Sequence, residues 1–342
     1  MCDTFAFAHG GGVWFGKNSD REPDEPQRVE YVAPVTGDPS ASLPVTYITI
    51  DQQPDRFGYL MGRPDWLWGA EMGVNDQGLA VGNEAVFTAG AGQAEPALLG
   101  MDLVRLALER AATARDGVTV ITGLLARYGQ GGAAGYRNKR FRYDNSFLLA
   151  DAREIWQVET AGKAWVARPY SLAAISNSFS LQPPFSLHSP DQPPQQPFRY
   201  RNKRLMTWLA GAEPRRQCAL RLAGRLQKQA AVEAAEVMAI LRTHARADRP
   251  TGNRDLCMHA GGPHRPSETT NAMVAWLGPA GPKVWFTGCP QPCCSEFQPV
   301  AFDAIQVAQT FGEGFWEQQR GLLDGLTSSE RRERRAWAGR PR

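Results

Sequence analysis

Apolar and polar residues alternate with a period of two in several short stretches near both ends of the chain, and this alternation predicts β-strands. The first two stretches, residues 4–8 and 13–15, are rich in β-forming residues and flank the turn sequence His-Gly-Gly-Gly at residues 9–12. Because glycine accepts positive φ, this turn favours a hairpin. Such a hairpin would bring residues 16–20 back beside residue 2.

Further strands are predicted at residues 28–32 and 45–50, and another is expected to end at Asn83-Glu84 after a turn over residues 75–78. Residues 146–177 alternate apolar runs with turn residues, which predicts a meander of four short antiparallel strands that ends at Ser176-Asn177-Ser178. The last predicted strands are residues 269–277 and 283–288, which would close a second sheet.

Helical periodicity is confined to the middle of the chain. It covers residues 95–128, with a break expected at Asp116-Gly117, and two later stretches, residues 216–226 and 232–241. The strand and helix order, and the lack of a Gly-x-Gly-x-x-Gly or Walker sequence, favour stacked mixed or antiparallel sheets flanked by helices over a doubly wound nucleotide fold.

Composition adds limits on function. The 342 residues are 42% apolar and 21% charged, with a formal net charge of +3, as expected of a globular protein of one large or two smaller α/β domains. We expect one domain over residues 1–320 and a charged helix or tail over residues 321–342. The arginines of this C-terminal segment favour a solvated helix end over an RNA-binding or acidic-surface-binding segment. No nucleic-acid partner, membrane span or signal peptide is expected, so a cytoplasmic location is predicted.

Six cysteines occur in the chain, and in a reducing compartment most should be thiols. Cys289, Cys293 and Cys294 form a C-x3-C-C cluster, for which the nearest histidines are His259 and His264. A zinc site there is an alternative, but buried thiols under a proline-rich loop are favoured, and neither a metal nor another cofactor is expected. A structural hydrogen-bonding role is favoured for His259 over a catalytic one.

The most reactive candidate is Cys2. If Met1 is removed, Cys2 carries both a thiol, with an unperturbed pKa of about 8.5, and a free α-amino group that titrates near about 8. That amine can accept the thiol proton, so a nucleophile at this position needs no histidine partner.

The sequences around this residue resemble those of a known family. Met-Cys-Asp-Thr-Phe at residues 1–5 and Phe-Gly-Lys-Asn-Ser-Asp-Arg-Glu-Pro at residues 15–23 are similar to the secernins of the C69 dipeptidases, within the N-terminal nucleophile hydrolases. The similarity continues through Gly-Asn-Glu-Ala-Val at 82–86, Ile-Ser-Asn at 175–177 and Cys-Met-His at 257–259, up to about residue 302.

This resemblance implies an α+β fold, a four-layer αββα sandwich, and hydrolysis of small peptides or amides, dipeptides above all, through a Cys2 thioester. It implies that Asn177 and Asn83 stabilise the oxyanion and that Asp20 orients the α-amine. Lys17 would lower the thiol pKa. Bile-salt hydrolase relatives usually have arginine at that place, so their substrate preferences do not transfer.

Other assignments stay more open. Glu84, Asn18 and Trp66 are candidates for substrate contact, although Glu84 could equally be structural and Trp66 could plug the edge of a core. Relatives place an arginine near the nucleophile, and Arg199, Arg201 and Arg204 are candidates. An acyltransferase with the same nucleophile and a non-catalytic secernin-like regulatory or binding protein are the alternative functions, and a homo-oligomer is left open.

Overall fold

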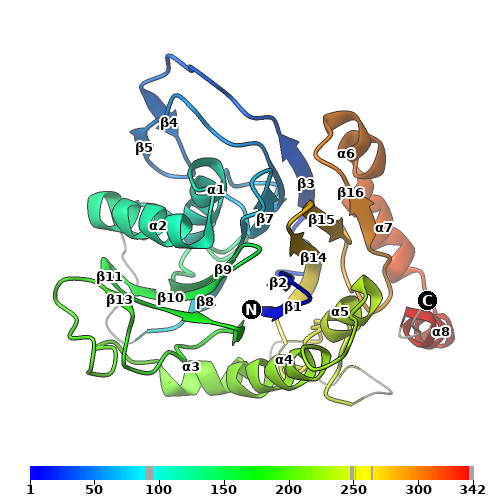
Figure 1. Ribbon diagram of the computed structural model, residues 1–342. Coiled ribbons are helices and arrows are strands. Elements are labelled where there is room, and N and C mark those ends of the chain that lie inside the picture. Colours follow the sequence, from blue (N-terminus) through cyan, green and yellow to red (C-terminus); the bar gives the residue numbers. More distant parts are fainter. Residues whose placement is uncertain (89–94, 247–249, 251, 263–264, 339–342) are drawn as a thin grey trace.

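Two β-sheets stacked face to face form the centre of the molecule, and helices cover their outer faces (Figure 1). The structure is a computed structural model, and it describes residues 1–88, 95–246, 250, 252–262 and 265–338. Residue 1 lies beside the central strands, and the last helix lies at the periphery (Figure 1).

The first sheet has six strands and is built around the N-terminal hairpin. Its order is β12-β1-β2-β14-β15-β16, and all neighbours are antiparallel. The strands are β1 (Cys2–His9), β2 (Gly12–Arg21), β12 (Leu172–Ile175), β14 (Glu268–Gly278), β15 (Gly281–Phe286) and β16 (Gln298–Val300). The predicted hairpin is confirmed, and its turn contains Gly10 and Gly11 at φ 52° and 79°, where a side chain would be strained.

The second sheet has eight antiparallel strands in the order β13-β11-β10-β9-β8-β7-β6-β3. They are β3 (Gln27–Val32), β6 (Tyr59–Pro64), β7 (Met72–Asn75), β8 (Ala80–Val86), β9 (Asp144–Ala150), β10 (Ile155–Ala161), β11 (Ala164–Tyr170) and β13 (Leu187–His188). A separate two-stranded ribbon consists of β4 (Ser42–Pro44) and β5 (Thr49–Asp51).

Apolar side chains fill the three interfaces between the layers. Phe15, Leu60 and Met273 belong to the core between the two sheets. Helices α1 (Gly100–Arg110) and α2 (Ala114–Tyr128) pack on the eight-stranded sheet, and α4 (Ala212–Leu226) and α5 (Ala234–Leu241) pack on the six-stranded sheet. The arrangement is a four-layer αββα sandwich, as the resemblance implied.

The remaining helices lie at the edges of the sandwich. They are α3 (Arg204–Leu209), which precedes α4, and α6 (Ala304–Thr310), α7 (Phe315–Asp324) and α8 (Ser328–Ala338), which follow β16 (Figure 1). Arg331 of α8 donates hydrogen bonds to Gln291 and to the carbonyl of Leu323, so this helix is held against the body of the protein. Among the described residues, no helix is long and apolar enough to cross a membrane.

Three local predictions were wrong. Residues 45–50 do not form one strand, because Pro44 ends β4 and the Val45 nitrogen donates to the Ile48 carbonyl in a turn. The helical region starts at Gly100 and breaks at residues 111–113, because Thr113 caps α2 by accepting a hydrogen bond from the Asp116 nitrogen. The fourth strand of the predicted meander, β12, leaves the second sheet and pairs with β1 of the first.

Candidate active site

The hairpin places Cys2 and Asp20 side by side. Cys2 pairs with Ser19 across β1 and β2, so Asp20 follows directly beside the thiol. The Asp20 nitrogen donates to Cys2 Sγ at 3.3 Å, and the amino group of Met1 donates to the Asp20 carbonyl at 2.7 Å. The separation of 18 positions in sequence is thereby reduced to contact distance.

Asn177 reaches the same point because β12 crosses between the sheets. Its Oδ1 accepts a hydrogen bond from the Cys2 nitrogen at 3.0 Å, and its Nδ2 donates to the Ala85 carbonyl at 2.9 Å. The side-chain amide therefore holds the Cys2 nitrogen. The expected oxyanion role for Asn177 would need the Nδ2 group, which is directed at Ala85 in this structure.

Asn83 lies in the wall of the cavity in front of Cys2. Its Nδ2 donates to Asn145 Oδ1 at 3.0 Å and faces Met101 Sδ at 3.8 Å. The hydroxyl of Tyr143 also lines the cavity and donates to Met101 Sδ at 3.3 Å. Met101 does not line the cavity, and because sulfur is a weak acceptor, the Tyr143 hydroxyl and one Asn83 hydrogen are bound only weakly in this direction.

Arg215, which the sequence did not single out, links these groups. Its side chain is fully buried, donates to the Cys2 carbonyl at 3.1 Å and to Asn177 Oδ1 at 2.6 Å, and forms an ion pair with Asp3. Asp20 Oδ2 lies 3.8 Å from the same guanidinium. One arginine therefore contacts the backbone of the nucleophile, its amide partner and both nearby carboxylates.

The three arginines expected near the site do not take this position. Arg201 is exposed, Arg199 pairs with Asp191 at 3.9 Å, and the side chain of Arg204 is not among those described. The sequence could have indicated Arg215 by its position in α4, where it lies on the buried face. The other residues of that face are Ala212, Ala219, Ala223 and Leu226. An arginine within an apolar helix stripe is unusual, and it indicates a buried partner of opposite charge.

Burial dominates the electrostatics of the nucleophile. It raises the pKa of the Cys2 thiol to about 12, although the positive charges of Lys17 and the amino terminus oppose this shift. Burial likewise raises the pKa of Asp20 to about 7, against the amino terminus and Arg215. The thiol is therefore protonated at neutral pH in this form of the protein, and a nearby base is needed to make the thiolate.

Lys17 and Glu84 form a buried ion pair behind the nucleophile. Lys17 Nζ lies 2.9 Å from Glu84 Oε2 and donates to the Asn83 carbonyl at 2.7 Å. Burial disfavours the charge on Lys17, but Cys2 and Glu84 outweigh it and the pKa of Lys17 is raised. Glu84 is fully buried and also accepts from Thr4, so it does not reach the cavity and the expected substrate contact is corrected to a structural role.

Asn18 and Trp66 also lie outside the lining of the cavity. Both Nδ2 hydrogens of Asn18 are donated to backbone carbonyls, of Leu241 and Leu256, each at 2.8 Å, so its expected substrate contact is likewise replaced by a structural one. Trp66 Nε1 donates to Glu25 Oε1 at 2.7 Å, and Glu25 does line the cavity. Trp66 thus holds the lining residue Glu25 in place without lining the cavity itself.

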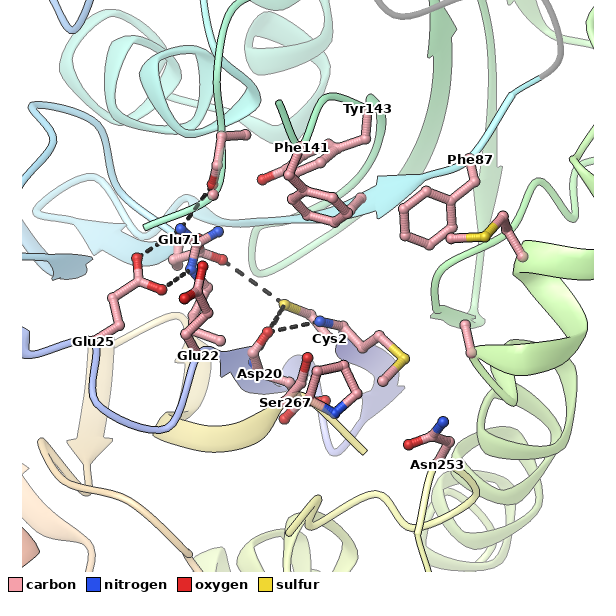
Figure 2. A pocket seen from close by; sticks show the side chains of 18 of the residues that line it. Cys2, Asp20, Glu22, Glu25, Glu71, Phe87, Phe141, Tyr143, Asn253 and Ser267 are labelled. Carbon is pink, nitrogen blue, oxygen red and sulfur yellow. Dashed lines mark hydrogen bonds and ion pairs between the residues drawn. The ribbon is translucent and has the colours of Figure 1, made fainter. Parts of the chain in front are cut away.

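The cavity in front of Cys2 has a volume of about 350 Å³. Figure 2 shows Phe87, Phe141 and Tyr143 on one side of Cys2, and Asp20, Glu22, Glu25 and Glu71 on the other. Its lining also includes Met1, Arg21, Ala134, Met206, Leu209, Ala210, Asn253, Pro266 and Ser267. The cavity therefore has an apolar wall and a charged wall that meet at the thiol.

The charged wall carries more negative than positive charge. Arg21 forms a bidentate ion pair with Glu25 at 2.6 and 3.0 Å, and its Nη1 lies 3.3 Å from Glu71 Oε1. Glu22 lines the same wall. Glu71 Oε2 accepts a long contact of 3.8 Å from Cys2 Sγ, so its carboxylate is the one nearest the reacting atom. One arginine cannot neutralise three glutamates, and the wall favours a cation.

Comparisons with known proteins agree with this fold. Residues 66–178 match the model of peptidase family C69. The fold is similar to that of a mutant conjugated bile acid hydrolase from Clostridium perfringens, with a TM-score of 0.55 and 13% identity over 88% of this chain and 92% of that chain. It is also similar to a penicillin V acylase from Agrobacterium tumefaciens, with a TM-score of 0.52 and 15% identity over 84% and 82%.

The match to the family model includes the strand that bears Asn83 and the residue that holds the Cys2 nitrogen, Asn177. The two solved structures agree with it in the overall arrangement of sheets and helices. The match to peptidase family C69 over residues 66–178, together with a fold shared with two hydrolases, supports an enzyme that hydrolyses amide C–N bonds.

Proposed function

We propose that the protein is a dipeptidase that cleaves small peptides with a free amino terminus through a Cys2 thioester. The observation that carries this proposal is the position of the Cys2 thiol between an apolar wall and a wall with three glutamates and one arginine. A dipeptide fits this arrangement, because its α-ammonium lies a few bonds from the carbonyl that the thiol attacks and could therefore reach the glutamates.

Removal of Met1 must precede the reaction, and it has two consequences. It frees the α-amine of Cys2, and it empties the part of the cavity that Met1 occupies. The freed nitrogen would keep its hydrogen bond to Asn177, now 3.0 Å long, close to the Asp20 carbonyl that accepts from Met1. A neutral amine held there can take the proton from Sγ, which replaces the histidine of other cysteine hydrolases.

The thiolate then attacks the peptide carbonyl, and the carbonyl π electrons move to the oxygen. Asn83 and Tyr143 are the donors that we assign to this oxyanion, because both line the cavity and each directs a hydrogen at the weak acceptor Met101 Sδ, which a substrate oxygen could replace. Burial raises the pKa of Tyr143, so its hydroxyl stays protonated and can donate. Loss of one oxyanion donor typically raises the barrier by about 3 kcal/mol.

Collapse of the intermediate breaks the C–N bond, and the protonated Cys2 amine returns its proton to the leaving amine. Water then attacks the thioester while the same amine takes a proton from it, and the thiol is restored. Lys17 stays charged behind the nucleophile and favours the thiolate. Asn177 and Arg215 fix the nitrogen that moves the proton in both steps.

Recognition of the substrate ammonium is assigned to Glu71, with Glu22 and Glu25 contributing to the negative potential. Glu71 Oε2 lies 3.8 Å from the thiol, and its Oε1 is ion-paired with Arg21 at 3.3 Å but accepts no hydrogen bond of good geometry among the described residues. Phe87 and Phe141 of the apolar wall would hold the side chains of the substrate.

A panel of substrates tests this proposal. Protein that starts at Cys2 by intact mass is assayed with free dipeptides, with the same dipeptides acetylated at the amino end, and with acyl amides of amino acids. We expect turnover of the free dipeptides, at least about tenfold slower turnover of the acetylated ones, and none with Cys2→Ala. Preference for the acetylated or acyl substrates would overturn the dipeptidase assignment, and hydrolysis by Cys2→Ala would overturn the mechanism.

A further inference from the structure

Four side chains from three separate segments meet behind the active site. His244 follows α5, Cys257 and His259 lie in the segment before β14, and Cys293 lies in the loop after β15. Their ligand atoms all lie within 4.8 Å of one another. We propose that these four residues bind one structural zinc ion.

The distances between the ligand atoms fit a tetrahedral ion. His259 Nε2 lies 3.1 Å from His244 Nε2, 3.5 Å from Cys257 Sγ and 3.3 Å from Cys293 Sγ. With Zn–N bonds near about 2.0 Å and Zn–S bonds near about 2.3 Å, the edges of a tetrahedron are roughly 3.3–3.8 Å. Three measured edges are therefore close to the values that a shared ion requires.

Hydrogen bonds alone do not account for this convergence. A neutral imidazole nitrogen has either one hydrogen or one lone pair in the ring plane, so His259 Nε2 can satisfy only one partner well. Three polar atoms nevertheless lie within 3.5 Å of it. An ion at the centre resolves the conflict, because each of the four atoms then directs its own lone pair at the metal.

The chemistry and burial of the set select the kind of ion. Two thiolates and two imidazoles suit zinc, whereas magnesium and calcium prefer oxygen ligands. Two thiolates also balance the charge of a divalent cation, as a buried site needs. Cys257 and Cys293 are 0% and 2% exposed and His259 is 9% exposed, so the site is closed to substrate. A closed set of four protein ligands is typical of a structural site.

Hydrogen bonds to backbone carbonyls already hold the three segments together. The Cys257 nitrogen donates to the Thr243 carbonyl at 3.0 Å, and Arg242 donates to the Pro292 and Ser295 carbonyls at 2.9 and 3.0 Å. The ligand set differs from the C-x3-C-C cluster of the sequence. Only Cys293 of that cluster belongs to it, since Cys294 contacts Cys293 Sγ at 3.7 Å from outside.

The zinc site also has a route to the nucleophile. Met258, between two of the ligands, donates its backbone N–H to Thr269 Oγ1 at 2.9 Å. Thr269 Oγ1 in turn donates to Asp20 Oδ1 at 2.5 Å. An ion that fixes residues 257–259 would therefore fix the hydroxyl that orients Asp20, so the zinc would act through structure rather than by contact with substrate.

The test uses the full-length protein without a histidine tag, grown with added zinc and purified without chelator. We expect about one zinc per chain by mass spectrometry of the metal. Protein loaded with cobalt(II) should show the strong visible absorption of tetrahedral coordination together with a thiolate-to-cobalt charge-transfer band. This spectrum is measured on the natural sequence, so it does not depend on whether a variant folds.

Matched variants then identify the ligands. His244→Ala and Cys293→Ser should retain less than about a tenth of the zinc and lose the charge-transfer intensity in proportion, whereas Cys294→Ser and Cys218→Ser should retain about all of it. The proposal is overturned if the natural protein holds less than about 0.1 zinc per chain and gives no tetrahedral cobalt spectrum. It is also overturned if Cys294→Ser loses the metal while Cys293→Ser keeps it.

Discussion

The backbone nitrogen of Cys2 donates a hydrogen bond to Asn177 Oδ1 at 3.0 Å, across 175 positions of sequence. Arg215 Nη2 donates to the same oxygen at 2.6 Å. The Asn177 oxygen thus faces two donors and its nitrogen faces the Ala85 carbonyl, which leaves one orientation for the side-chain amide. The nitrogen that we propose as the base is held by a side chain whose own position is fixed on both sides.

Replacement of Asn177 tests this relationship. Asn177→Ala removes the acceptor for the Cys2 amine and for Arg215, so we expect kcat to fall by about 10- to 100-fold and stability to fall by about 1–3 kcal/mol. Asn18→Ala is the matched control, because Asn18 is also a buried asparagine with two backbone hydrogen bonds on the neighbouring strand. Asn18→Ala should lower stability while kcat stays within about twofold. Equal losses of kcat in both variants would contradict the assignment.

Arg215 is expected to be essential for stability as well as for the site. Arg215→Met leaves Asp3 and Asp20 buried without their cation, and we expect a loss of about 3–5 kcal/mol in the free energy of unfolding by urea. The second change Asp3→Asn removes one of the stranded charges and should restore part of that loss. If Arg215→Met costs less than about 1 kcal/mol, the guanidinium is not the electrostatic centre that its contacts imply.

Substrate recognition by charge is tested at Glu71. Glu71→Gln keeps the shape of the side chain but removes its charge, so kcat/KM for free dipeptides should fall by about 10- to 100-fold, as expected for one charge-assisted hydrogen bond. The acetylated dipeptides should change by less than about threefold. Glu30→Gln is the control, because Glu30 also pairs with an arginine, Arg63 at 2.7 Å, but outside the cavity. A uniform loss across both substrate classes would argue against an ammonium contact.

Two buried glutamates should make the protein less stable as the pH rises from about 4 to about 7, whereas most carboxyl groups have the opposite effect. Burial raises the pKa of Glu159 and of Glu84 to about 7, well above the value of about 4.3 in an unfolded chain. Between these two pH values the folded state binds more protons than the unfolded state. The stabilisation that these two groups contribute is therefore complete below about pH 4 and is lost as pH rises through about 7. Glu159→Gln removes one such group away from the cavity.

Urea unfolding of the natural protein and of Glu159→Gln at pH 5 and pH 8 measures this effect. The natural protein should lose roughly 1–3 kcal/mol more than the variant between the two pH values. Glu159 accepts hydrogen bonds from the Leu181 and Ser180 nitrogens, and glutamine can still accept them, so the variant should fold. Identical pH slopes would show that Glu159 is ionised in the folded protein.

Local sequence patterns predicted much of the architecture because they report on single elements. The Gly-rich turn at residues 9–12 and the alternation around it were sufficient for the hairpin, and therefore for the proximity of Cys2 and Asp20. The pattern failed at residues 45–50, where Pro44 and a turn at Val45 outweigh the β-forming side chains. It also placed the helix break too late, since the cap at Thr113 was not read as a start signal.

The partners of the buried charges could not be read from local pattern. Glu84 and Asn18 are polar residues beside the family motifs, and the sequence does not say on which side of the sheet each side chain ends. In the structure they face Lys17 and the backbone of residues 241 and 256 rather than the cavity. Arg215 shows the opposite, because it lies in a helix without any family motif and still contacts the site residues Cys2, Asp3 and Asn177.

The sequence by itself determined the hairpin and predicted the nucleophile and the resemblance to a family, because these depend on residues that are adjacent or joined by one short turn. Only the tertiary structure decided that β12 crosses to the other sheet, that Arg215 fills the space under Cys2, and that His244, Cys257, His259 and Cys293 converge. The reason is physical, since these contacts arise from how whole layers pack against each other, and that packing depends on the sum of many buried side chains rather than on any one stretch of the chain.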